Sequence, residues 1–109
     1  MDYVESRDKG GDDLCWYAIH TKPREEDRAL SNLMAWHVET FAPKIRQSQR
    51  SQLKGKPAYS VRPLFPNYIF ARFQLINLHK IRFTRGVQNV VGFGGQVAPV
   101  DDAAIELIR

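Results

Sequence analysis

The sequence of 109 residues lacks the features of membrane, secreted and multidomain proteins. Its single cysteine, Cys15, excludes an internal disulfide and favours a reducing, cytoplasmic location. No apolar run approaches the roughly 20 residues that cross a bilayer, and the acidic N-terminus does not resemble a secretory signal. With 43% hydrophobic residues, the length suits one folded domain and leaves little for a second.

Negative charge is missing from the middle of the chain. No carboxylate lies between Glu39 and Asp101, although the chain as a whole carries a net charge of +4. That interval contains ten cations: Lys44, Arg46, Arg50, Lys54, Lys56, Arg62, Arg72, Lys80, Arg82 and Arg85. A basic stretch without acids is typical of a protein that binds a polyanion, most often a nucleic acid. A solvated basic face that only aids solubility has the same composition, so charge alone does not name the partner.

Patterns for catalysis and for metal binding are also absent. The three histidines, at 20, 37 and 79, share no metal-ligand spacing, and Cys15 has no second cysteine beside it. The glycines at 92, 94 and 95 match neither a P-loop nor a dinucleotide-binding fingerprint. No pair of carboxylates is spaced for acid–base chemistry. The sequence therefore predicts a protein that is not an enzyme and needs no cofactor or metal.

The hydrophobic pattern predicts a flexible acidic lead-in over residues 1–14 and one folded domain over 15–109. Strands are predicted over 15–20, 38–45, 59–62, 67–73 and 87–93, and helices over 23–37, over 75–82 and after Asp101 or Asp102. Residues 46–58 are polar and basic, which predicts a long mobile hairpin connection. The segment 67–73 is the strongest strand and is expected at the centre. This order predicts an α/β sandwich around a mostly antiparallel sheet.

Aromatic residues are concentrated in one short stretch. They are Phe65, Tyr68, Phe70 and Phe73, with Pro63 and Pro66 stiffening the approach. Strand alternation places Tyr68 and Phe70 on one face and Ile69 on the other. Two of these rings would suffice for a core, so the surplus indicates an apolar surface for a partner helix. The alternative is that all four rings belong to the core.

Four segments carry a resemblance to a known family. They read Cys-Trp-Tyr-Ala-Ile-His-Thr-Lys over 15–22, Pro-Leu-Phe-Pro-Asn-Tyr-Ile-Phe over 63–70, Thr-Arg-Gly-Val over 84–87 and Val-Gly-Phe-Gly over 91–94. In this order they resemble the N-terminal domain of NusG-type transcription elongation factors, and the second and third are most similar to the specialised RfaH branch. The resemblance covers residues 15–109 and implies a four-stranded, largely antiparallel sheet flanked by helices. Because the family continues into a small β-barrel KOW domain, we expect this chain to be a fragment that lacks it.

The resemblance implies that RNA polymerase is the partner. In the family, the clamp helices of the largest catalytic subunit dock on a pocket of aromatic and aliphatic side chains. Carried over by position, this pocket contains Tyr17 or His20, together with Phe65, Tyr68, Phe70 and Phe93. His20 stands where RfaH carries an aromatic residue, which would make the pocket more polar.

The resemblance also implies a surface that contacts the non-template DNA strand. It maps to Lys22, Arg24, Arg28, Thr84 and Arg85. The first three surround a predicted helix N-terminus, where backbone N–H groups favour phosphate, and a turn arginine can meet an unpaired base. Asn32 stands where RfaH has a histidine that contacts DNA, so the sequence does not define the recognised element.

These features predict a monomeric elongation and antitermination domain that binds the clamp and the displaced strand, and so keeps polymerase closed around its hybrid. A free-standing RNA- or single-stranded-DNA-binding module, of RRM-like or ribosomal type, shares the basic charge and the aromatic sheet. An RRM, however, should show two aromatic RNP strings in βαββαβ order. A small nucleic-acid enzyme should carry clustered acids, which the basic middle lacks.

Overall fold

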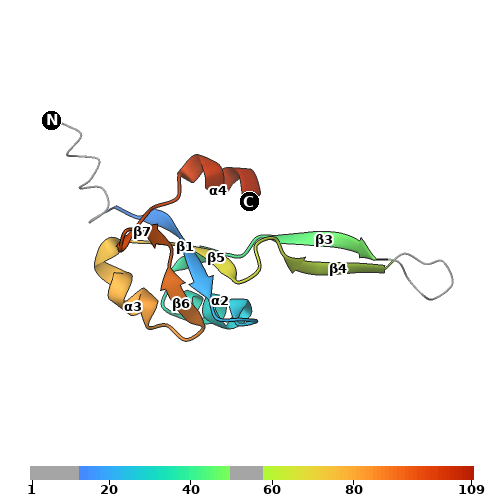
Figure 1. The fold of residues 1–109 in the computed structure, drawn as a ribbon, viewed down its shortest axis with the longest axis horizontal. Coiled ribbons are helices and arrows are strands. Elements are labelled where there is room, and N and C mark those ends of the chain that lie inside the picture. Colours follow the sequence, from blue (N-terminus) through green and yellow to red (C-terminus); the bar gives the residue numbers. More distant parts are fainter. Residues whose placement is uncertain (1–12, 50–57) are drawn as a thin grey trace.

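A computed structural model describes residues 13–49 and 58–109 of the chain. Its centre is a four-stranded antiparallel sheet with the strand order β2-β5-β1-β6 (Figure 1). The strands are β1 (Cys15–Thr21), β2 (Glu39–Phe41), β5 (Tyr68–Phe73) and β6 (Val87–Val90). The prediction of a largely antiparallel sheet is confirmed, and the strand that reads most strongly in the sequence, β5, is indeed central.

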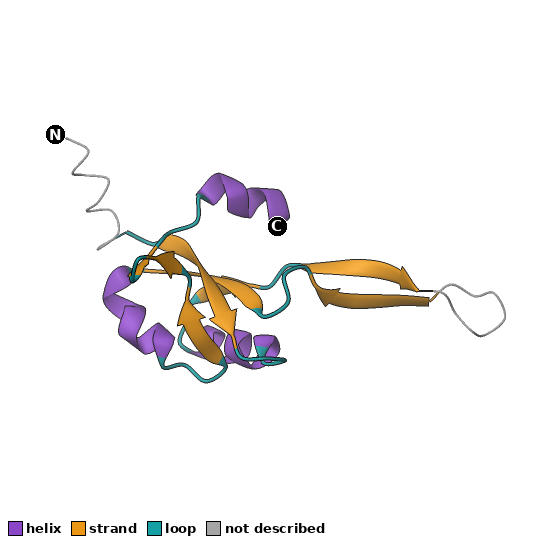
Figure 2. Ribbon diagram, viewed as in Figure 1, coloured by secondary structure: helices purple, strands orange, loops and turns teal. Residues whose placement is uncertain are grey.

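Helices lie on both sides of this sheet, which confirms the predicted sandwich (Figure 2). One face is covered by α2 (Glu26–Ala35) and by α3 (Leu78–Arg82), which follows a 3-10 turn at Leu75–Asn77. The short α4 (Asp102–Ile108) lies on the other face. Helix α2 begins later than predicted because Arg24 takes a left-handed backbone conformation, with φ of 61°, which a helix cannot continue. In the described part of the chain, no helix is long and apolar enough to cross a bilayer.

The two-residue alternation of the strands divides the apolar side chains between two cores. Tyr17 of β1 packs towards α2 and α3 in a cluster that includes Leu33. Its neighbour Trp16 points the other way and packs with Phe70 of β5 against Ile105 of α4. Burial of each such side chain contributes about 1.5–3 kcal/mol, so both helical layers are held to the sheet mainly by apolar contact.

A separate two-stranded ribbon, here called the arm, projects from the sheet (Figure 1). It consists of β3 (Lys44–Gln49) and β4 (Ala58–Pro63). The prediction of one strand over 38–45 is wrong, because Pro43 has no N–H for a ladder and the chain leaves the sheet there. The prediction of a loop over 46–58 is also wrong at its ends, where residues 46–49 and Ala58 are strand. Residues 50–57, like residues 1–12 of the predicted lead-in, lie outside the described part of the chain.

The predicted strand over 87–93 is interrupted after β6. The chain then forms the small hairpin of β7 (Gly92–Phe93) and β8 (Gln96–Val97). Gly94 and Gly95 make its turn with φ of 56° and 82°, a conformation that side-chain-bearing residues rarely adopt. Asp101 is the N-cap residue of α4, as expected, although its side chain makes no capping hydrogen bond.

Candidate functional site

The sheet face that α4 covers in part also carries an aromatic surface, which consists of His20, Phe65, Tyr68 and Phe70. Phe70 is shared with the core under α4. His20 and Tyr68 are cross-strand partners, and their rings stack with centroids 4.9 Å apart. Phe65 meets Phe70 edge to face at 6.1 Å. Phe65 and Tyr68 are each 39% exposed, whereas Phe70 is buried and forms the floor. The predicted surplus of rings on one sheet face is therefore present at the surface.

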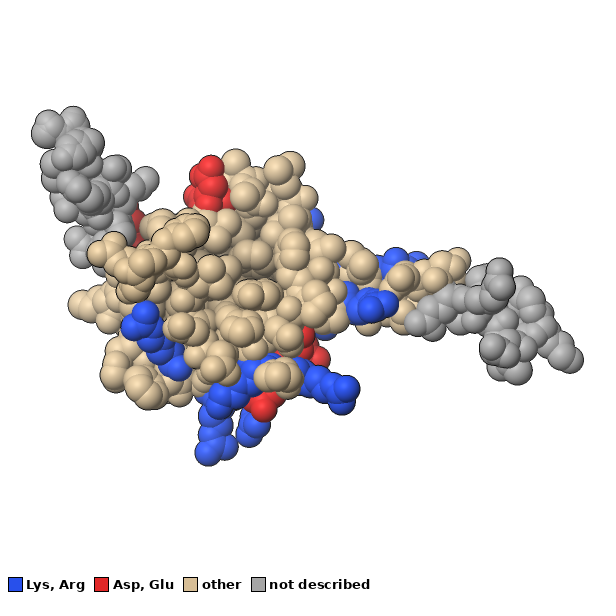
Figure 3. All heavy atoms as spheres, viewed as in Figure 1, with Lys and Arg blue, Asp and Glu red and all other residues tan. Residues whose placement is uncertain are grey.

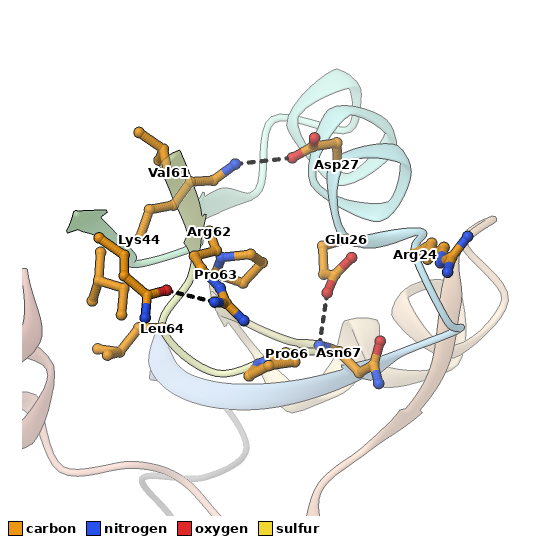
Figure 4. A pocket seen from close by; sticks show the side chains of 12 residues that line it. Arg24, Glu26, Asp27, Lys44, Val61, Arg62, Pro63, Leu64, Pro66 and Asn67 are labelled. Atoms are coloured by element: carbon orange, nitrogen blue, oxygen red, sulfur yellow. Dashed lines mark hydrogen bonds and ion pairs between the residues drawn. The ribbon is translucent and has the colours of Figure 1, made fainter. Parts of the chain in front are cut away.

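The loop that presents this surface is held by three hydrogen bonds. The Tyr68 N–H donates to the Phe65 carbonyl at 3.0 Å and closes a tight turn. Between them, Asn67 has a left-handed φ of 69°, which asparagine tolerates better than most residues. Its N–H donates to Oε2 of Glu26 in α2 at 2.7 Å (Figure 4), and its carbonyl accepts from the Thr21 N–H at 2.8 Å. Both exposed rings consequently stand on backbone that the helix and β1 hold in place.

Tyr17 does not belong to this surface. It precedes His20 by three residues and therefore lies on the opposite sheet face, where its fully buried ring stacks on Phe73 with centroids 4.5 Å apart. Burial raises the pKa of the Tyr17 hydroxyl above its usual value, and the nearby Cys15 thiol raises it further. The hydroxyl has no hydrogen-bond partner within the described residues. Of the two alternatives in β1, only His20 reaches the aromatic surface.

Phe93 is also separate from the aromatic surface. It lies on the β7–β8 hairpin and is 81% exposed. In the described part of the chain, its ring contacts none of the rings of the aromatic surface. Its exposure suits a binding role, but the structure does not bring it together with the other predicted pocket residues.

Two turns that carry predicted DNA-contacting cations lie side by side. The Lys22 N–H, after β1, donates to the Gly86 carbonyl, before β6, at 2.9 Å. The Asn32 side-chain amide of α2 donates to the Arg85 carbonyl at 3.2 Å. Gly86 has φ of 95°, and a Cβ there would lie 2.7 Å from the backbone nitrogen of Ala29, so only glycine lets the turn rest against the helix. We call Lys22, Arg24, Arg28 and Arg85 the basic turn surface.

All four side chains of the basic turn surface are exposed. Figure 3 shows Lys and Arg side chains projecting together on the lower side of the view, beneath α2 and the turn that precedes β6. Arg28 also lies 3.6 Å from the Glu25 carboxylate, an exposed ion pair that contributes little stability. The predicted set of cations is thus brought together, although residues 24 and 85 are far apart in sequence.

Thr84 differs from its neighbours because its side chain points into the protein. It is buried, and its hydroxyl donates to the Lys80 carbonyl at 2.9 Å, which satisfies an acceptor at the end of α3. The prediction that the Thr84 side chain reaches DNA therefore has no support in the geometry. Its role is to hold the turn that carries Arg85.

Sequence reasoning missed Glu26 and Asn32 as the residues that tie the two surfaces to α2. In the sequence Glu26 is simply an acidic residue near a helix start, and its partner Asn67 lies 41 positions away. The sequence drew attention to Asn32 only because RfaH has a histidine at that position. A pattern of residue types carries no signal for hydrogen bonds to backbone groups so distant in the chain.

Comparison with known proteins identifies the family of this chain. Residues 14–109 match the sequence model of the family described as transcription termination factor NusG. The chain belongs to the NusG family. A solved structure described as "Domain interaction in Thermotoga maritima NusG" has a similar fold, with a TM-score of 0.58 and 24% sequence identity over 87% of this chain. The match covers 55% of that Thermotoga maritima chain.

The family is described as one of transcription termination factors, and this chain carries its domain over residues 14–109. The predicted family and the predicted N-terminal-domain fold are confirmed. In the part of the chain that the structure describes, no three His, Cys, Asp or Glu side chains are grouped closely enough to hold a metal ion.

Proposed function

We propose that this NusG-family domain binds the clamp helices of the largest catalytic subunit of RNA polymerase through the aromatic surface. The observation that carries the proposal is the exposure of Phe65 and Tyr68 on a loop held by Glu26. Rigid aromatic anchors lose little conformational entropy on binding and suit the apolar face of a helix. His20, stacked on Tyr68, adds a polar edge to the same surface.

The basic turn surface is proposed to bind the non-template DNA strand. Lys22 and Arg24 lie just before the N-terminus of α2, where backbone N–H groups also favour phosphate. Arg85 projects from a turn whose carbonyl oxygens are held by Lys22 and Asn32, so its guanidinium starts from a fixed backbone. A cation at a helix start most readily meets phosphate, whereas a turn arginine can reach a base.

Binding both the clamp and the displaced strand would hold polymerase closed around its hybrid. Pausing would then become less favourable and elongation more processive, which is an antitermination activity of the RfaH type. The domain would act as a monomer in the cytoplasm, and polymerase would supply most of the affinity for DNA by raising the local concentration of the strand.

The clamp proposal is tested by titrating the chain with a peptide hairpin of the polymerase clamp helices. Phe65→Ala should weaken binding by about 1–3 kcal/mol, as truncation of an anchor ring does. Phe83→Ala is the matched control, since it removes an exposed phenylalanine ring that lies outside the aromatic surface. Equal affinities for Phe65→Ala and the unmodified chain would contradict the proposal. Binding of single-stranded RNA that depends on Phe65 or Tyr68 would instead favour a free-standing RNA-binding module.

The DNA proposal is tested on paused transcription complexes with altered non-template bases. Arg85→Ala should abolish the preference among sequences, because a base contact is lost. Lys22→Ala should weaken binding evenly across sequences and lower the slope of log affinity against log salt by about 0.7, the value for one phosphate contact on a single strand. If both variants lose activity equally on every sequence, the surface does not read DNA.

A further inference from the structure

The arm joins no other strand among the described residues. Its two strands pair only with each other, as a two-stranded sheet apart from the central one. Each strand has six residues, so the ribbon is about 20 Å long. An isolated hairpin of this kind is only marginally stable in water, so a bound partner would stabilise the arm.

The charge of the arm has one sign. Its described residues include Lys44, Arg46 and Arg62 and no carboxylate. In the sequence, the connecting residues 50–57 add three more cations and again no acid. The register puts Arg46 opposite Val61 on one face and Arg62 opposite Ile45 on the other, so each face presents one guanidinium. Such a surface complements a polyanion.

Both arginines are oriented by neighbours that leave N–H donors available. The Arg46 guanidinium lies 4.2 Å from the centroid of the Tyr59 ring and covers one face of that ring. Arg62 donates to the side-chain oxygen of Gln47 and points into a hollow at the base of the arm (Figure 4). Lys44 differs, because it pairs with Asp27 at 3.4 Å.

The hollow has a volume of about 740 Å³ and separates the base of the arm from the start of α2. Arg62 and Lys44 line it on the arm side, and Arg24 of the basic turn surface lines it on the other. Its two carboxylates are already engaged, Glu26 by the Asn67 N–H and Asp27 by Lys44. Basic side chains therefore continue from the turns to the arm.

We propose that the arm binds double-stranded DNA, with Arg46 and Arg62 as its phosphate contacts. A two-stranded β-ribbon fits the major groove of B-DNA, which is about 12 Å wide. Single-strand binders instead stack bases on open aromatic rings, and Arg46 covers one face of Tyr59. This site is additional to the proposed clamp and single-strand contacts and does not depend on them.

The test measures binding of the full chain to a fluorescent 20-base-pair duplex and to one of its single strands, by anisotropy between 50 and 200 mM salt. Replacing both Arg46 and Arg62 by Ala should weaken duplex binding about tenfold at the lower salt concentration. The slope of log affinity against log salt should fall by about 1.8, which corresponds to two phosphate contacts at 0.9 each. The matched control replaces Lys80 and Arg82 of α3 by Ala, which removes the same charge from another exposed element.

The double variant Arg46→Lys, Arg62→Lys keeps the charge and should bind the duplex within about threefold of the unmodified chain. It therefore separates loss of charge from any loosening of the ribbon in the Ala variant. Equal losses for the arm and α3 variants would overturn the proposal, because net charge alone would then account for binding. Equal affinity of the unmodified chain for the duplex and for the single strand would overturn it as well. The two proposals fail separately, because the arm is tested on a free duplex and the basic turn surface on the non-template bases of paused complexes.

Discussion

The two faces of the central sheet are made by the same strands, yet one is a core and the other is partly a surface. Helices α2 and α3 cover the first face, and Tyr17 and Phe73 are buried there. On the second face the seven-residue α4 covers Trp16 but does not extend over Tyr68. The length of the covering helix therefore decides whether an aromatic residue on a strand is buried in the core or stays exposed for binding.

Phe73→Ala should have the largest effect on stability, because Phe73 lies on the covered face of the sheet. Its ring is buried on the covered face, so the change leaves a cavity and should cost about 3–5 kcal/mol of unfolding free energy. The same truncation at Tyr68, on the open face, should cost less than about 1 kcal/mol. Urea denaturation of both variants measures the difference, and similar losses at the two positions would contradict it.

Removing the link between α2 and the aromatic loop should have an intermediate effect. Glu26→Ala leaves the Asn67 N–H without its acceptor and should cost about 1 kcal/mol of unfolding free energy. Glu26→Gln keeps an acceptor oxygen and should recover much of that loss. Amide hydrogen exchange at Asn67 provides the direct measurement, since it should accelerate in the Ala variant. Unchanged exchange there would show that the bond does not hold the loop.

Tyr17→Phe should have the smallest effect at neutral pH, within about 1 kcal/mol of the unmodified chain, because the buried hydroxyl has no partner to lose. Its effect should instead appear in alkali. The raised pKa means that the native state keeps the proton while the unfolded state loses it above about pH 10, so stability falls as pH rises past that value. Thermal melts between pH 8 and 11 should show a shallower decline for Tyr17→Phe. Tyr59→Phe on the exposed arm is the control and should retain the full decline.

The family was predicted from the resemblance of four segments to NusG-type factors. The sequence predicted the order of most elements, because period-two alternation and turn residues are local signals. It also separated Ile69 from Tyr68 and Phe70 correctly, since neighbouring strand residues face opposite sides. It left Tyr17 and His20 as alternatives because alternation does not say which face is covered. Residues 46–49 of the arm were assigned to a loop because residues 46–48 are all exposed, and such a segment has no apolar alternation to detect.

Helix α2 sets the spacing between the two proposed binding surfaces. Glu26 holds the aromatic loop and Asn32 holds the turn of Arg85, six residues further along the same rigid helix. Their separation along the axis is therefore about 9 Å, at 1.5 Å per residue. One residue inserted between them would shift Asn32 by about 1.5 Å and rotate it by about 100° around the helix, away from the Arg85 carbonyl. The number of helical residues between Glu26 and Asn32 therefore sets the distance between the two surfaces. Any insertion or deletion there would change both this distance and the side of the helix on which Asn32 lies.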